Sequence, residues 1–222
     1  MTDNIAGKVR EILLERENNG EESIKPFIIA DNIYLLKTII EKAPQGYEGY
    51  EKKVGFDNLN KGIQSLEEEK YITAEEYFNK SIETTKTPRF QEFPAHNVLI
   101  VAQALLGLSM INRHNNELGK ATRRISRAYH RYPAKEYLLI KGDLFLERGR
   151  NMKAQIAYIK AIQKNPENAH AYNGVGVLQS RMNTYTSKKQ AMHLFEEALK
   201  YEPENKIFQR NKEICLSKIE ND

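Results

Sequence analysis

The sequence predicts an all-α protein built from helix–turn–helix units stacked in a row. The main observation is a pattern of small, aromatic and proline residues, whose alanines recur at steps of 47, 33 and 37 residues. Composition agrees with a packed helical array: 40% of the 222 residues are hydrophobic and 29% are charged. That balance suits a soluble chain with an apolar core and not a disordered one.

The repeat has five columns. They are a small residue, an alanine 12 positions later, a large apolar residue, a second small residue and a proline. The four copies are Gly62, Ala74, Phe78 and Ser81, with Lys86 in the proline column; Ser109, Ala121, Ile125, Ala128 and Pro133; Gly142, Ala154, Tyr158, Ala161 and Pro166; and Gly176, Ala191, Phe195, Ala198 and Pro203, with three extra residues before Ala191.

Each column has a physical reason. The alanine, the large residue and the second small residue stand at i, i+4 and i+7, which places them on one face of a helix. Small residues let a neighbouring helix approach closely, and the large residue fills the space between the helices. Proline cannot continue a helix, so it marks the turn into the next unit. No unit buries its apolar face alone, so the units must stack.

Residues 1–54 do not match the repeat. Segments 5–16 and 27–42 carry amphipathic patterns and are predicted as two helices, followed by a loop rich in glycine. One interpretation is a divergent helical pair that caps the array. The alternatives are an element that docks a specific partner, or one that fills the array's own groove.

An insertion is expected at 87–101, after the first copy. Pro88 and Pro94 predict that it is non-helical, and insertions in repeat arrays often fall on a binding face. Its Phe90 and Phe93 either pack back into the core or contact a ligand.

At the other end, residues 206–222 are predicted to form a capping helix, since a repeat array needs a terminal helix with a polar outer face. Phe208, Asn211, Cys215 and Ile219 form one stripe of this helix, with Ile207 and Ile214 beside it. Cys215 is interpreted as a small buried hydrophobic residue.

These columns resemble the tetratricopeptide repeat, whose period is about 34 residues. The resemblance covers residues 55–205, in units 55–86, 102–134, 135–168 and 169–205. It implies a right-handed α-α superhelix in which the first helix of each unit lines a concave groove. It also implies a non-catalytic protein-interaction module: an adaptor, scaffold or chaperone, such as those in bacterial secretion, pilus, motility or envelope assemblies.

The resemblance assigns groove positions to the first helix of each unit. They are Phe56, Leu59, Asn60 and Ile63; Gln103, Leu106, Met110 and Arg113; Glu136, Leu139, Ile140 and Asp143; and His170, Asn173 and Val177. Apolar residues dominate the first three units. The implied partner is therefore another protein that offers an amphipathic helix or an extended apolar segment. A homo-oligomer is an alternative.

A basic stripe is predicted on a second helix, formed by Lys120, Arg123, Arg124, Arg127 and Arg131. It is either a solvated or acidic-protein-facing surface, or the basis of a nucleic-acid-binding or regulatory role. The formal net charge is only +4, from 34 basic and 30 acidic residues. This small excess does not demand a nucleic-acid partner, so nucleic acid is the alternative and not the expectation.

Signs of catalysis are missing from the sequence. It has no glycine-rich phosphate loop and no nucleophile elbow, and its five histidines are isolated from one another. We therefore expect no enzymatic activity, no cofactor and no metal. No apolar run approaches the roughly 18 residues of a membrane helix, and the first residues lack a signal-peptide pattern. A cytoplasmic protein without membrane insertion is expected.

Overall fold

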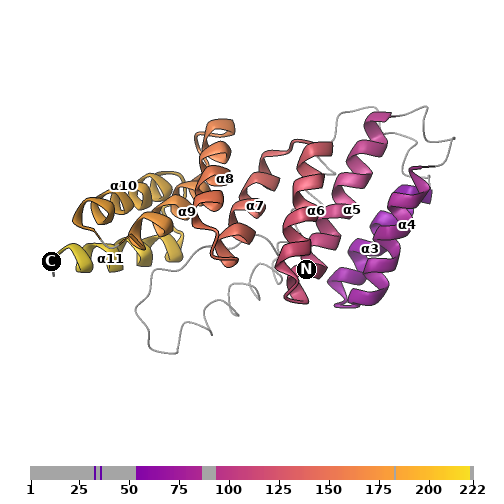
Figure 1. Cartoon of the computed structure of the whole chain (residues 1–222), viewed down its shortest axis with the longest axis horizontal. Coiled ribbons are helices and arrows are strands. Elements are labelled where there is room, and N and C mark those ends of the chain that lie inside the picture. The colour runs from indigo at the N-terminus through magenta and orange to yellow at the C-terminus, as the bar shows by residue number, and fades with distance from the viewer. Residues whose placement is uncertain (1–32, 34–35, 37–53, 87–93, 183, 221–222) are drawn as a thin grey trace. The chain divides into compact units, whose positions relative to one another are not determined.

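The computed structural model describes residues 33, 36, 54–86, 94–182 and 184–220. Every regular element in these residues is an α-helix, as the sequence predicts (Figure 1). The helices are α3 (Val54–Glu67), α4 (Tyr71–Thr84), α5 (Pro94–His114), α6 (Leu118–Arg131), α7 (Lys135–Glu147), α8 (Asn151–Lys164), α9 (Ala169–Ser180), α10 (Tyr185–Tyr201) and α11 (Lys206–Glu220). No helix among them has both the length and the apolarity to cross a bilayer.

The described chain divides into two compact units. The first runs from Ile33 to Ala171 and the second from Tyr172 to Glu220, so the boundary falls within α9. In the first unit, α3 packs on α4, α5 on α6 and α7 on α8, and each pair also contacts the next through α4–α5 and α6–α7. In the second unit, α10 packs on α11. This packing of each helix on its neighbours is consistent with a helical repeat.

The turns inside the three hairpins of the first unit share one geometry. Glu69, Asn116 and Gly149 have φ values of 58°, 59° and 67°, in the left-handed region. Each lies five residues before the repeat's alanine. In each turn the next N–H donates to the carbonyl five residues back, at 2.7–2.8 Å. This bond satisfies a carbonyl that the helix end leaves open. The sequence repeat is therefore also a repeat of backbone conformation.

Three of the small residues of the first column are glycines that face an aromatic ring. A β-carbon at Gly62 would lie 2.7 Å from Cε1 of Phe78, and one at Gly176 would lie 2.6 Å from Cε1 of Phe195. Gly142 faces the ring of Tyr158 in the same way. Real β-carbons do not approach this closely, so glycine is required for the two helices of each hairpin to touch.

The second copy solves the same problem with a larger first residue and a smaller second one. Ser109 stands in place of the glycine, and Ile125 stands in place of the ring. The Ser109 hydroxyl donates to the carbonyl of Ala121 at 3.0 Å, so this buried polar group is satisfied within the hairpin. A similar bond joins the Ser81 hydroxyl to the carbonyl of Gly55 at 2.7 Å.

Gly107 on α5 joins the first hairpin to the second. A β-carbon there would lie 2.8 Å from Cε1 of Phe78, and closer still to two other atoms of that ring. Phe78 of α4 is thus held between Gly62 on one side and Gly107 on the other, and it is fully buried. The close approach between the first two hairpins depends on this second glycine, which lies outside the repeat columns.

The segment after the first hairpin differs from the prediction. Helix α5 begins at Pro94, so residues 94–101, expected to be non-helical, form its first two turns. Proline is tolerated in the first turn because the N–H that it lacks has no helical partner there. Phe90 and Phe93 lie outside the described residues. The two predicted N-terminal helices also lie outside them, apart from Ile33 and Leu36, which are both helical.

The last helix, α11, occupies the range predicted for the capping helix. Its buried residues are Phe208, Asn211, Ile214 and Cys215, and Ile219 is half-buried. Burial raises the pKa of the Cys215 thiol. A raised pKa disfavours the thiolate, which is the reactive form, so the structure agrees with a packing role.

Candidate functional site

The fifteen positions expected to line a groove differ widely in exposure. Asn60 is exposed, whereas Phe56, Arg113, Glu136 and His170 are half-buried. The other ten are buried: Leu59, Ile63, Gln103, Leu106, Met110, Leu139, Ile140, Asp143, Asn173 and Val177. All lie in the first unit except Asn173 and Val177, which lie in the second. A partner touches the buried members only after displacing whatever covers them.

Gln103 on α5 stands out among the buried members. Its side chain is fully buried, and among the residues that the structure describes neither its amide nitrogen nor its amide oxygen has a hydrogen-bond partner. An amide left unpaired in an apolar environment costs about 1–3 kcal/mol. Leu106, one turn further along α5, is also fully buried. Gln103 is therefore a polar group with one unused donor group and one unused acceptor.

Tyr137 on α7 also carries an unpaired polar group. Its ring is fully buried, and its hydroxyl has no hydrogen-bond partner in the described part of the chain. Burial holds the pKa of Tyr137 far above its usual range, with a smaller contribution from the charge of Glu136. The side chain is therefore a neutral hydroxyl that can donate or accept one hydrogen bond.

Two other expected groove residues of the first unit, Asp143 and Arg113, already form hydrogen bonds within the fold. Asp143 accepts a 2.7 Å hydrogen bond from the hydroxyl of Tyr158, and both side chains are buried. Arg113, at the end of α5, forms a forked ion pair with Glu147, at the end of α7. Its Nε donates at 2.8 and 3.1 Å and its Nη2 at 2.5 Å. This pair ties the first helices of two successive hairpins.

In the second unit, Asn173 is part of the contact between α9 and α11. Its Oδ1 accepts a hydrogen bond from Nδ2 of Asn211 at 2.9 Å, and both side chains are almost completely buried. The Nδ2 of Asn173 has no hydrogen-bond partner within the described ranges. A ring contact lies nearby in sequence, since Tyr172 stacks on Tyr201 of α10 with ring centroids 6.2 Å apart. Asn173 therefore connects the capping helix to α9.

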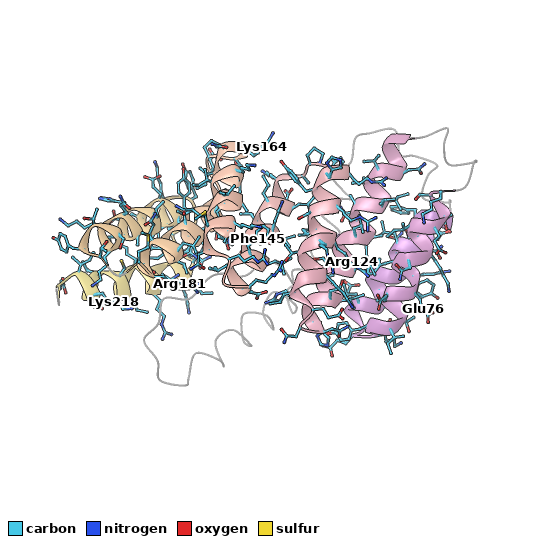
Figure 2. All side chains as sticks on the ribbon, viewed as in Figure 1. Glu76, Arg124, Phe145, Lys164, Arg181 and Lys218 are labelled. Atoms are coloured by element: carbon cyan, nitrogen blue, oxygen red, sulfur yellow. The ribbon has the colours of Figure 1, made fainter. Side chains whose placement is uncertain are left out.

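The basic stripe on α6 is divided by its partners. Lys120 pairs with Glu117. Arg124, which is labelled in Figure 2, reaches Glu75 of α4 at 3.7 Å. Burial lowers the pKa of the half-buried Arg124, while the charge of Glu75 opposes that shift. Arg124 thus belongs to the contact between α4 and α6.

The other three members, Arg123, Arg127 and Arg131, are exposed, and no carboxylate of the described residues pairs with them. They are the part of the stripe that is open to an external partner. Within the described ranges, no group of three or more His, Cys, Asp or Glu side chains is placed to hold a metal ion.

No protein-family model matches the chain, and no curated protein matches it. The sequence placed Gln103 and Arg113 on the expected surface, but it did not show that Arg113 is paired and Gln103 is unpaired. Pairing between Arg113 and Glu147 spans 34 residues, and the unpaired amide of Gln103 has no sequence signal.

Proposed function

We propose that this chain is a non-catalytic protein-binding module of the tetratricopeptide type, coiled as a right-handed superhelix. It would serve as a cytoplasmic adaptor, scaffold or chaperone. The recurring column residues support this proposal, as do the three hairpin turns with one backbone geometry and the glycine–ring contacts inside the hairpins. The first helices of the first unit, α3, α5 and α7, would carry the docking surface.

The observation that carries the proposal is the unpaired amide of Gln103. A folded protein normally pairs its buried polar groups, so an exception calls for a physical reason. A carboxamide can donate to a backbone carbonyl and accept from a backbone N–H, which is what a bound peptide offers. Binding would then remove a cost that the free protein bears. This gain is available only to a partner that reaches α5.

The neighbouring residues indicate what that partner would look like. Leu106 and Met110 of α5 and Leu139 of α7 are apolar and buried, while Asn60 and Phe56 of α3 are more accessible. An apolar surface with one central hydrogen-bonding group suits an extended apolar segment or an amphipathic helix. The accessible residues would form the outer part of the contact.

Gln103→Met tests this proposal, because it keeps the length of the side chain and removes the amide. We expect it to stabilise the free protein by about 1–2 kcal/mol, since an unpaired buried polar group disappears. We expect it to weaken partner binding at the same time. The matched control is Gln190→Met on α10, an exposed position where the same change should alter neither property.

The partner itself can be found by photo-crosslinking from position 60 in a native lysate, with position 76 on α4 as the negative control. Both side chains are exposed, but only Asn60 belongs to the expected surface. Binding of the captured protein would then be measured for wild type and both glutamine variants. A Gln103→Met protein that is more stable and binds with unchanged affinity would refute the role of Gln103.

The exposed arginines of α6 support a second candidate function. Arg123, Arg127 and Arg131 have no carboxylate partner within the described chain. They could neutralise phosphates of a nucleic acid. Replacing all three with glutamine should abolish such binding and flatten its salt dependence. If wild type shows no salt-sensitive binding to single- or double-stranded nucleic acid, this candidate is excluded.

A further inference from the structure

Helix α8 carries an apolar stripe on its exposed face. Met152, Ile156 and Ile159 are 77%, 50% and 40% exposed. They stand at i, i+4 and i+7, so they lie within an arc of about 60° and extend over about 10 Å of the helix. Large apolar side chains on a helix surface normally turn towards the core, so a continuous exposed row indicates a contact surface.

The stripe is not part of the hairpin's own packing. The opposite face of α8 carries Ala154, Tyr158 and Ala161, all of which are almost completely buried. Tyr158 fills the space beside Gly142 and donates to Asp143, so this face is fully used. The helix therefore has two apolar faces, and only one of them packs within the hairpin.

Lysines border the stripe along one edge. Lys153, Lys160 and Lys164 are exposed and lie about 60–120° from the centre of the stripe. Helix α8 contains no acidic residue, and no carboxylate of the described residues pairs with these lysines. Figure 2 labels Lys164 near the end of this helix. The edge is therefore a row of uncompensated positive charge.

Helix α7 adds to the same edge. Its Lys141 is half-buried, and its pKa is lowered by burial and then by the nearby charges of Lys160 and Lys153. The ring of Phe145 lies 5.8 Å from Nζ of Lys141 and 5.9 Å from Nζ of Lys153. A carboxylate placed at this edge would meet several cations that have no counter-ion in the described part of the chain, and would relieve the repulsion between them.

We propose that the Met152–Ile156–Ile159 stripe docks an acidic amphipathic segment of another protein, with its apolar row on the stripe and its carboxylates along the lysine edge. The surface is small, so the contact should be weak and dissociate readily. It lies on a second helix and uses none of the first-helix residues of the proposed function. The two proposals therefore stand or fail separately.

Other occupants fit less well. A second copy in antiparallel, twofold-symmetric contact would bring the two lysine edges together, and α8 offers no carboxylate to compensate them. An anionic membrane surface favours helices with cations on both sides of a broad apolar face that includes aromatic residues. Here the cations of α8 lie on one edge, and its only aromatic residue, Tyr158, is buried.

The test uses the full chain and a synthetic helical peptide, with leucines along one face and glutamates along the adjoining edge. A second peptide has lysine in place of every glutamate. We expect the acidic peptide alone to bind, as measured by fluorescence anisotropy. Ile156→Gln should weaken binding about tenfold, since a buried aliphatic side chain contributes roughly 1.5 kcal/mol or more. Lys160→Glu should weaken it several-fold.

Ile72→Gln is the matched control, because Ile72 is also exposed but belongs to α4, which packs on α3 and α5. It should leave binding unchanged, as should Gln103→Met. Equal binding of both peptides, or no effect of Ile156→Gln, would overturn the proposal. Two other results would also overturn it if the acidic peptide failed to bind. One is binding to phosphatidylserine vesicles that Ile156→Gln abolishes. The other is a dimer, seen in sedimentation velocity, that Ile156→Gln abolishes.

Discussion

Gly107→Ala probes the contact that joins the first two hairpins. In an open helix this change would stabilise the protein by about 1 kcal/mol, because alanine has the higher helix propensity. At position 107 the new β-carbon would lie less than 3.0 Å from three ring carbons of Phe78. The ring has little room to move away, since it also packs against Gly62, where a β-carbon would lie 2.7 Å from Cε1 of the ring. The two helices must therefore separate.

The expected magnitude follows from these two opposing effects. Overpacking a well-filled core costs about 1–3 kcal/mol, and a contact made by backbone belongs at the upper end of that range. After the gain in helix propensity, we expect Gly107→Ala to lower the free energy of unfolding by about 2 kcal/mol. The melting temperature should then fall by about 4–8 °C. Urea and thermal unfolding, followed by far-UV circular dichroism, measure both quantities.

Gly119→Ala on α6 is the matched control. The nearest atom to its new β-carbon would be Nη2 of Arg148 at 3.9 Å, an ordinary contact with a flexible side chain. We expect a change between zero and a gain of about 1 kcal/mol, opposite in sign to that of Gly107→Ala. In a protein that already carries Phe78→Leu, Gly107→Ala should lower the free energy of unfolding by less than it does in wild type. The reasoning is refuted if Gly107→Ala is as stable as wild type, or if its loss is unchanged in that background.

Three further changes test other contacts. Tyr158→Phe removes the donor to Asp143 and should lower the free energy of unfolding by about 1.5–3 kcal/mol in urea titrations; a loss below about 0.5 kcal/mol would contradict the pairing. Glu69→Gly should raise the free energy of unfolding by about 0.5–1 kcal/mol, because glycine adopts a φ of 58° without strain. Gly149→Ala should lower the free energy of unfolding for the same reason. If both variants were as stable as wild type, the turns would not carry this strain. Burial raises the pKa of the Cys215 thiol, so its alkylation should be slow in the folded state at neutral pH and fast in denaturing urea. For the same reason the free energy of unfolding should fall as the pH rises above the ordinary range of thiol pKa values. Equal alkylation rates in the two states would contradict burial.

Much of the local structure could be predicted from the sequence. The all-helical class and the order of hairpins follow from the spacing of residues such as Ala154, Tyr158 and Ala161, because i, i+4 and i+7 share a helix face. The capping helix follows from the stripe that includes Phe208 and Cys215. Pro94 was misinterpreted as a sign of non-helical structure, because the same residue that ends a helix is also accepted in its first turn.

Which side chains of the candidate sites are paired, buried or exposed could not be predicted in the same way. The sequence places Gln103 and Arg113 on the first helices, but their pairing depends on atoms far away along the chain. Arg113 pairs with Glu147 on a different hairpin, while Gln103 has no hydrogen-bond partner among the described residues. The helical spacing of Met152, Ile156 and Ile159 would have predicted that they share one face of α8. Only their exposure shows that this row is not another core face.

The sequence by itself determined the fold class and the position of each hairpin, because helix periodicity and the small-residue columns are local properties. Tertiary structure alone decided which side chains are paired, buried or open, because these depend on what each face packs against. Gly107 illustrates the difference. In the sequence it interrupts an apolar run, and in the structure it is where Phe78 of the preceding hairpin fits, because only a residue without a side chain leaves room for the ring.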